Sequence, residues 1–210
     1  MRRIDPTSWP RASTYLHYRS MGAPHLGITA DVDVTAVLKR SKDEESSFFA
    51  VMMHMLIGAA NEVPQLRQRI REEDNADIVV EHSHVDPAFT VAVDGGMFNF
   101  ATVPFERDPR AFAAAVAEVS ASQRGNPNLQ PFEGRRDDVI YMSCLPWMHF
   151  TSISHPVHTD QPDSVPRIAW GRYTGVGDRV HLPVNIQVHH ALVDGGHLGA
   201  FYAALRARLS

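Results

Sequence analysis

The residues best suited to chemistry lie near the C-terminal end, in the run QVHHALVDGGH at positions 187–197. Alternating apolar residues predict a strand over 179–188, and an apolar stripe predicts a helix over 195–209. The paired histidines, His189 and His190, therefore lie where a strand turns into a helix. An imidazole that projects from such a turn is accessible to a substrate, and its neutral form can act as a general base near pH 7.

Asp194 follows His190 by four positions and is expected to hold this turn through a buried cation instead of orienting the imidazole. Gly195 supplies the backbone freedom that a tight turn needs. A short His-x-x-x-Asp-Gly pattern also fits histidines that are incidental at a strand end. The motif alone therefore leaves both interpretations open.

Further segments accompany this motif in a fixed order over nearly the whole chain. The motif resembles the active-site motif of chloramphenicol acetyltransferases, within the larger His-x-x-x-Asp-Gly class of CoA-dependent acyltransferases. The other matching segments are Trp9-Pro10-Arg11, Phe48-Phe49-Ala50-Val51-Met52, residues 85–91, Ser143-Cys144-Leu145-Pro146-Trp147 and residues 177–183.

The resemblance implies a direct acyl transfer with no acyl-enzyme. His190 matches the general base that removes a proton from an acceptor hydroxyl as the hydroxyl attacks the thioester of acetyl-CoA. Ser143 matches the serine whose hydroxyl donates to the tetrahedral oxyanion, a contribution of roughly a few kcal/mol. The alternative for Ser143 is an ordinary strand serine with no role in the reaction.

The resemblance also implies an ion pair between Asp194 and Arg11 that fixes the histidine turn and is structural. Four aromatic residues match positions around the two substrates, and each fits a core aromatic residue equally well. Those at the acceptor pocket are Tyr18 and Phe98, and those near the CoA channel are Trp147 and Tyr173.

Several positions depart from the family pattern. Gly196 replaces the usual phenylalanine after Asp-Gly, and Ser47 replaces a basic residue near the CoA phosphate. Leu26 and Ala169 are expected at the acceptor site, where the family often has phenylalanine and threonine.

The resemblance implies O-acetylation, and so inactivation, of chloramphenicol. The departures leave open another alcohol or amine acceptor, such as another antibiotic or a secondary metabolite. A non-enzymatic binding or scaffold module is a third possibility.

The family resemblance further implies a homotrimer, with active sites at the subunit interfaces and a small-molecule acceptor and acetyl-CoA as partners. A metal site is not expected. The chain has 12 histidines, but the close pairs, His82/His84 and His155/His158, lack a recognisable spacing to further ligands.

The elements that must position these residues indicate an α+β fold: a two-layer sandwich with a mixed, largely antiparallel sheet covered by helices. Hairpin turns are expected at 94–96 and 174–178. Strands are predicted at 27–34, 78–81, 89–93, 97–103, 139–144, 167–173 and 179–188. Helices are predicted at 35–42, 47–63, 111–122 and 195–209, the third capped at Asp108-Pro109 and ended at Gly125-Asn126-Pro127.

Composition sets the outer limits. The 210 residues, 44% of them hydrophobic, suit a single domain over 1–210. A net charge of -4 lacks the basic excess that nucleic acid binding requires. No apolar run reaches the roughly 20 residues that span a bilayer. The single cysteine, Cys144, fits a reducing compartment, so a cytoplasmic protein without membrane contact is expected.

Overall fold

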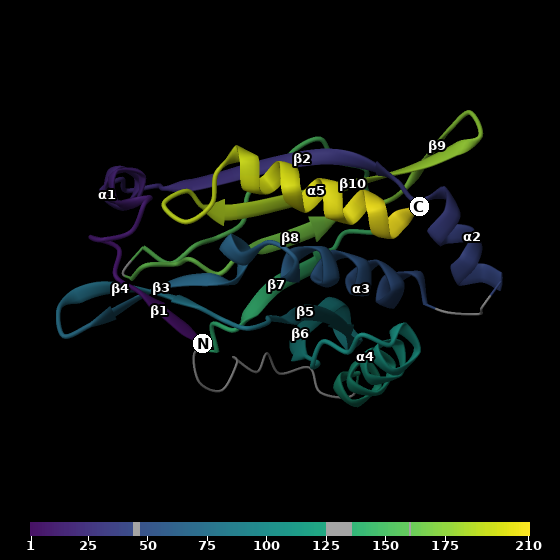
Figure 1. Cartoon of the computed structure of the whole chain (residues 1–210). Coiled ribbons are helices and arrows are strands. Elements are labelled where there is room, and N and C mark those ends of the chain that lie inside the picture. The colour runs from purple at the N-terminus through teal and green to yellow at the C-terminus, as the bar shows by residue number, and fades with distance from the viewer. Residues whose placement is uncertain (44–46, 125–135, 160) are drawn as a thin grey trace.

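The computed structural model describes residues 1–43, 47–124, 136–159 and 161–210, and its centre is one large sheet (Figure 1). Its strands follow the order β2 (His25–Asp33), β10 (Arg179–His189), β8 (Arg167–Trp170), β7 (Val139–Cys144), β5 (Asp86–Val93) and β6 (Met97–Thr102), and β9 (Thr174–Val176) pairs with β10. The sheet is mixed, because β7 runs parallel to β5 and β8 while the other pairs are antiparallel.

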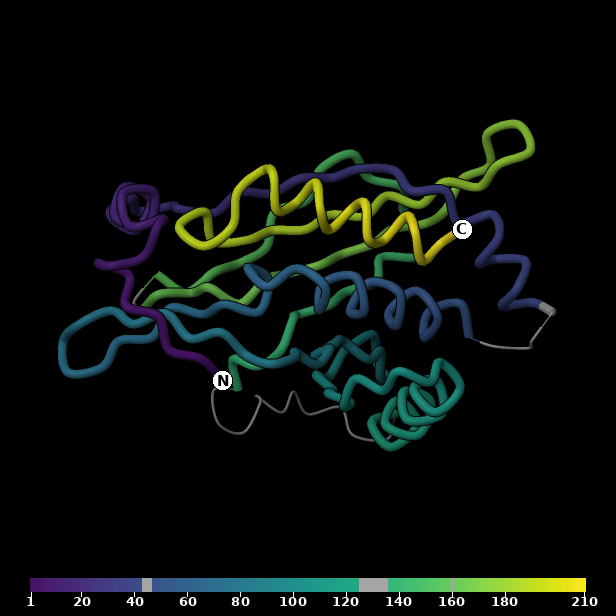
Figure 2. Tube along the Cα trace, in the orientation of Figure 1, coloured from purple at the N-terminus to yellow at the C-terminus, as the bar shows by residue number. Residues whose placement is uncertain are grey.

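Helices form the second layer. The helices α3 (Phe48–Asn61) and α5 (Gly195–Leu209) run side by side across one face of the sheet (Figures 1 and 2). Three further helices lie at the periphery: α1 (Ala12–Arg19), α2 (Thr35–Asp43) and α4 (Pro109–Gln123). The predicted two-layer α+β fold is confirmed. No helix in the described residues is long and apolar enough to cross a membrane.

The two faces of β10 differ in chemistry. Val184, Ile186 and Val188 point into the hydrophobic core under the helices. Because side chains alternate along a strand, Asn185 and Gln187 point to the opposite face, and both are buried there. Among the described residues of segment 145–166, His155 donates its backbone N–H to Gln187 Oε1 on this face.

A second, three-stranded sheet was not expected from the sequence. It has the order β1 (Arg2–Ile4), β4 (Ala76–Glu81) and β3 (Gln68–Glu73). Only β4 was partly predicted, since β1 has three residues and β3 ends in charged residues that carry little hydrophobic signal. Asp74 and Asn75 form the β3–β4 turn with positive φ angles of 51° and 62°, a conformation that Asp and Asn tolerate.

The other predicted elements are found with small shifts. The 94–96 turn is the 3-10 helix η2 (Asp94–Gly96), and another 3-10 helix, η1 (Pro64–Arg67), follows α3. The strand predicted at 167–173 ends at Trp170, and the 174–178 link contains β9. Asp108 caps α4 by accepting a hydrogen bond from Arg110 N. The predicted end of that helix at Gly125-Asn126-Pro127 lies outside the described residues.

Candidate active site

His190 lies immediately after β10, and among the described residues its ring is held by an aromatic neighbour and not by a carboxylate. The backbone N–H of His190 donates to Pro24 O at 2.7 Å. Its imidazole stacks on the Tyr18 ring, with centroids 3.8 Å apart and planes inclined by 8°. Nδ1 is buried and has no hydrogen-bond partner in the described part of the chain. Nε2 is therefore the nitrogen that is available for chemistry.

The preceding histidine has a different environment. His189 is 3% exposed, and its Nδ1 accepts a hydrogen bond from Ala191 N at 3.3 Å. Burial, helped by nearby His25, lowers the pKa of His189 to about 4, so this imidazole is neutral at pH 7. The structure thus separates the pair into a buried strand histidine and a half-buried turn histidine.

Asp194 holds the turn through several contacts at once. Its Oδ1 accepts hydrogen bonds from Gly196 N and His197 N, while His197 Nδ1 accepts one from Asp194 N, which completes a capping box at the start of α5. Its Oδ2 lies 2.6 Å from Arg11 Nη1. Burial raises the pKa of Asp194, but the Arg11 hydrogen bond and the charge of His197 outweigh it and hold the pKa below its ordinary value.

The cation that contacts Asp194 at this turn is Arg11. The side chains of Arg11 and Asp194 are 20% and 36% exposed. Nε and Nη2 of Arg11 are nevertheless buried, without a hydrogen-bond partner among the described residues. The guanidinium is therefore largely buried, while the Asp194 carboxylate is partly solvated. The carboxylate lies on Arg11 and the helix N-terminus, away from the imidazole of His190.

Ser143 lies on the face of the sheet opposite the helices. It pairs with Ala169 on β8, and Ala169 pairs with Asn185 on β10, so the three side chains form a row on one face. Ala169 is fully buried in this row. Phe98 shares the face through the β7–β5–β6 register and is 48% exposed.

Within one protomer, Ser143 and His190 lie in different places. The row that contains Ser143 crosses β10 at Asn185, and His190 is five residues further along. At a rise of about 3.3 Å per residue this is about 16 Å along the strand, with two strand spacings of about 4.8 Å to the side. Figure 1 shows the opposed directions: the β10 arrow points left and the β8 arrow points right.

The remaining predicted residues fall into separate groups. Leu26 pairs with Val188 and packs against the core, on the helix side of the sheet. Trp147 and Tyr173 are 74% and 43% exposed, and the Tyr173 ring meets the edge of Phe48 with centroids 5.6 Å apart.

Near these aromatic residues, Ser47 is exposed at the N-terminus of α3 without a side-chain capping bond. Two features beside them were missed in the sequence. A Cβ at Gly171 would lie 2.6 Å from Met148 O, so glycine lets the Trp147-Met148 turn pack on β8. Arg172 is an exposed cation immediately before Tyr173, a position that the sequence alone could have indicated.

Histidines do not converge on a metal site in the described ranges, where no group of three or more His, Cys, Asp or Glu side chains is placed to hold an ion. His82 instead lies 3.0 Å from Asp137 Oδ1. The backbone N–H of His155 donates to Gln187 Oε1 at 2.9 Å, which fastens segment 145–166 to the sheet.

Comparisons with known proteins bear on the whole chain. Chloramphenicol acetyltransferase 3 of Escherichia coli is 27% identical over 205 residues, which cover 97% of this chain and 94% of that protein. Chloramphenicol acetyltransferase of Bacillus pumilus is 25% identical over 207 residues, covering 98% and 91%. A solved chloramphenicol acetyltransferase has a TM-score of 0.84 at 23% identity, covering 99% of this chain and 98% of that one.

More distant structures share the fold. A probable dihydrolipoamide acetyltransferase from Listeria monocytogenes has a TM-score of 0.65 at 17% identity, covering 98% of this chain and 92% of that one. A sequence model of the family described as chloramphenicol acetyltransferase matches residues 1–206. The chain therefore belongs to the chloramphenicol acetyltransferase family.

Proposed function

We propose that the protein transfers the acetyl group of acetyl-CoA to a hydroxyl of chloramphenicol and thereby inactivates the antibiotic. The observation that carries this proposal is the His190 turn. There, a half-buried imidazole stacks on Tyr18 while Arg11 and Asp194 hold the following helix in place. The named relatives, which match nearly full length, support the same reaction. Because acetyl-CoA is an intracellular metabolite, we assign the enzyme to the cytoplasm.

Two atoms would carry the reaction: His190 Nε2 and Ser143 Oγ. His190 Nε2 accepts the proton of the acceptor hydroxyl as the hydroxyl oxygen attacks the thioester carbonyl carbon. The carbonyl oxygen becomes an oxyanion, to which Ser143 Oγ donates a hydrogen bond. The intermediate collapses, the C–S bond breaks, and the imidazolium returns its proton to the CoA thiolate. The products are the acetyl ester and free CoA.

The separation of Ser143 from His190 supports a homotrimer with its active sites between subunits. Since the two side chains are too far apart to act on one acetyl group in a single protomer, His190 of one subunit would face Ser143 of the next. Both edge strands of the large sheet, β2 and β6, lack a neighbour within the described protomer. An assembly that brings the two half-sites together satisfies this geometry.

The surface around Trp147 and Tyr173 supports a CoA channel. Exposed aromatic side chains offer stacking surfaces for an adenine ring, and Arg172 supplies a positive charge for a phosphate. Arg172 would take over the role that the family gives to a basic residue where this chain has Ser47. On the acceptor side, Tyr18, Phe98 and Ala169 are the residues that we assign to the pocket. Leu26, which the resemblance also places there, packs against the core on the helix side of the sheet, so we give it no direct contact with the acceptor.

The test is an assay of thiol release from acetyl-CoA with and without chloramphenicol, with the product identified by mass. Acetylated chloramphenicol and loss of turnover in His190→Ala are expected. No chloramphenicol-dependent thiol release from a folded protein would refute the proposed acceptor. Sedimentation tests the assembly, because a fully active monomer would contradict a shared site.

A further inference from the structure

The backbone of the candidate base is held by the residue that precedes β2. The backbone N–H of His190 donates to Pro24 O at 2.7 Å, and Pro24 is followed by His25, the first residue of β2. Within the described residues, β2 pairs with β10 alone in the large sheet. The end of a strand with one neighbour opens more readily than the centre of a sheet. The Pro24 carbonyl therefore needs a further anchor to hold His190 in a fixed place.

His25 supplies an anchor on two sides. Its Nε2 lies 2.9 Å from the backbone carbonyl oxygen of Asp163. Because a carbonyl oxygen can only accept, Nε2 carries the proton and donates. Across the strand pair His25 is in register with His189, and the two rings meet edge to face with centroids 5.3 Å apart and planes inclined by 69°. His25 thus joins the start of β2 both to β10 and to the segment that contains Asp163.

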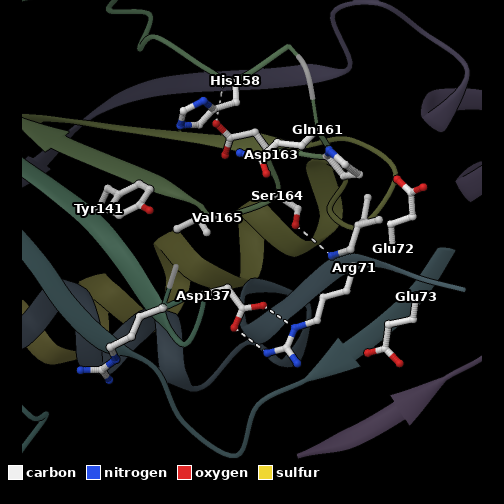
Figure 3. Close-up of a pocket in the computed structure, with 13 residues that line it drawn as sticks. Arg71, Glu72, Glu73, Asp137, Tyr141, His158, Gln161, Asp163, Ser164 and Val165 are labelled. Atoms are coloured by element: carbon white, nitrogen blue, oxygen red, sulfur yellow. Dashed lines mark hydrogen bonds and ion pairs between the residues drawn. The ribbon is translucent and has the colours of Figure 1, made fainter. Parts of the chain in front are cut away.

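Asp163 is itself firmly held. Its side chain is 5% exposed and forms an ion pair with Arg167 at the start of β8. The backbone N–H of His158 donates to the same carboxylate at 2.8 Å (Figure 3). The next residue, Ser164, accepts a hydrogen bond from Ile70 N of β3 at 2.8 Å (Figure 3). The acceptor of the His25 bond is therefore tied to the large sheet and to the three-stranded sheet.

We propose that His25 is a positioning residue for the general base, because its bond to Asp163 O holds the Pro24 carbonyl, and through it the backbone of His190, in the reactive place. This inference rests on the proposed function, which makes His190 the base. His25 acts through the adjacent Pro24 and does not touch the reacting atoms. Since a displacement of about 1 Å can cost about a hundredfold in rate, a loosened Pro24 carbonyl should lower kcat more than it weakens substrate binding.

Two variants of His25 test the hydrogen bond. His25→Phe keeps a ring against His189 but removes the donor to Asp163 O. We expect kcat with chloramphenicol to fall about tenfold, while KM for acetyl-CoA changes by less than about twofold. His25→Gln offers an amide N–H in place of Nε2–H and should restore kcat to within about threefold of wild type. Rescue by glutamine would assign the effect to the bond and not to the ring.

His54 provides a matched control. It is 5% exposed on α3, and its Nε2 also lies 3.1 Å from a backbone carbonyl oxygen, that of Glu106. Its ring packs against Phe105 and Phe112, which share no contact with the His190 turn. His54→Phe therefore removes the same kind of bond and should lower the melting temperature, but kcat of the folded variant should stay within about twofold of wild type. An equal loss of kcat in both phenylalanine variants would reduce His25 to a stabilising residue and overturn the inference.

Hydrogen exchange measures the same link without any substrate. Because the His190 amide is bonded to Pro24 O, it should exchange about tenfold faster in His25→Phe than in wild type. In His54→Phe and His25→Gln its rate should stay close to that of wild type. Mass spectrometry of a peptide that contains the turn follows this amide.

The outcomes separate the two proposals. If wild type forms no acetylated chloramphenicol, the proposed function fails, and the exchange rates alone decide whether His25 holds the turn. If chloramphenicol is acetylated and His25→Phe changes neither kcat nor exchange, the positioning role fails while the proposed function stands. Faster exchange at unchanged kcat would show that the Pro24 bond does not position the base, and would also overturn the inference.

Discussion

The turn at 189–197 and the sheet face under segment 145–166 hold their polar groups in different ways. In the turn, Asp194, Gly196 and His197 contact one another within four positions of the sequence. Under the segment, Gln187 contacts His155 across 32 positions. The turn therefore forms largely from its own residues, while the sheet face depends on contacts between distant parts of the chain.

The largest effect should come from the turn. His190→Ala removes the proton acceptor, and positioned general bases typically contribute about 10²- to 10⁴-fold, so kcat should fall by that much while KM for acetyl-CoA and the melting temperature hold. Steady-state kinetics measures this. His189→Ala should cost less in kcat. A reversal of the two ranks would assign the base to the strand histidine.

Ser143→Ala probes the other region. Loss of one oxyanion donor costs about 10²- to 10³-fold in kcat, and we expect a loss toward the lower end of this range. Ser143→Cys keeps the size of the side chain but weakens the donor and should fall between wild type and alanine. A loss below about threefold in Ser143→Ala would return Ser143 to an ordinary strand serine.

The same contrast explains what the sequence could predict. The strand-to-helix turn could be predicted from the sequence, because the alternation in 179–188, the Asp194 cap and the apolar stripe of the helix are local patterns. The pairing of Arg11 with Asp194 came from resemblance, since 183 positions separate them. Nothing local indicates that Asn185 and Gln187 are buried, because their covering segment has no regular periodicity.

The three-stranded sheet is a second region that the sequence alone could not predict. The β3 strand, Gln68–Glu73, contains Arg69, which is fully buried and donates to four backbone carbonyl oxygens, one of them Val139 O. A buried arginine without a carboxylate partner reads as a surface residue in the sequence. The charged strand was therefore not predicted.

The free energy of unfolding should depend on pH through two histidines, the buried His189 at the turn and the half-buried His155 under the sheet. Burial lowers the pKa of His189 to about 4 and also lowers the pKa of His155. Because the unfolded chain takes up these protons first, stability is full above about pH 6.5 and is lost as pH falls toward 4. His189 alone accounts for a loss on the order of 3 kcal/mol. Denaturant unfolding between pH 7 and 4.5 measures this loss.

A His189→Asn variant lacks the titrating imidazole. The free energy of unfolding should therefore fall less between pH 7 and pH 4.5 than in the wild type. Carboxylates act in a different window. Hydrogen bonds and charges around Asp137 and Asp163 outweigh burial and lower their pKa values, so their contribution is lost only below about pH 4. An unchanged slope in His189→Asn would contradict a buried neutral histidine at the end of β10.

The smallest effect is expected at the ion pair of the turn. Since Arg11 and Asp194 are 20% and 36% exposed, Arg11→Met and Asp194→Asn should each cost about 1 to 2 kcal/mol, below the roughly 3 to 5 kcal/mol of a fully buried pair. Both should lower kcat by misplacing His190. Asparagine still caps a helix, so Asp194→Asn reports mainly on the lost charge.

A double-mutant cycle distinguishes a structural pair from a catalytic relay. If the pair positions the turn, the double variant should cost less than the sum of the single variants by about 1 kcal/mol in unfolding free energy, with a matching coupling in kcat. If Asp194 oriented the imidazole directly, Asp194→Asn would cripple kcat with little change in melting temperature, and Arg11→Met would be nearly silent. The His190–Tyr18 stacking favours the first outcome, because within the described residues Nδ1 has no partner and no carboxylate bonds to the ring. Strict additivity in both measurements would show that the turn is held without Arg11.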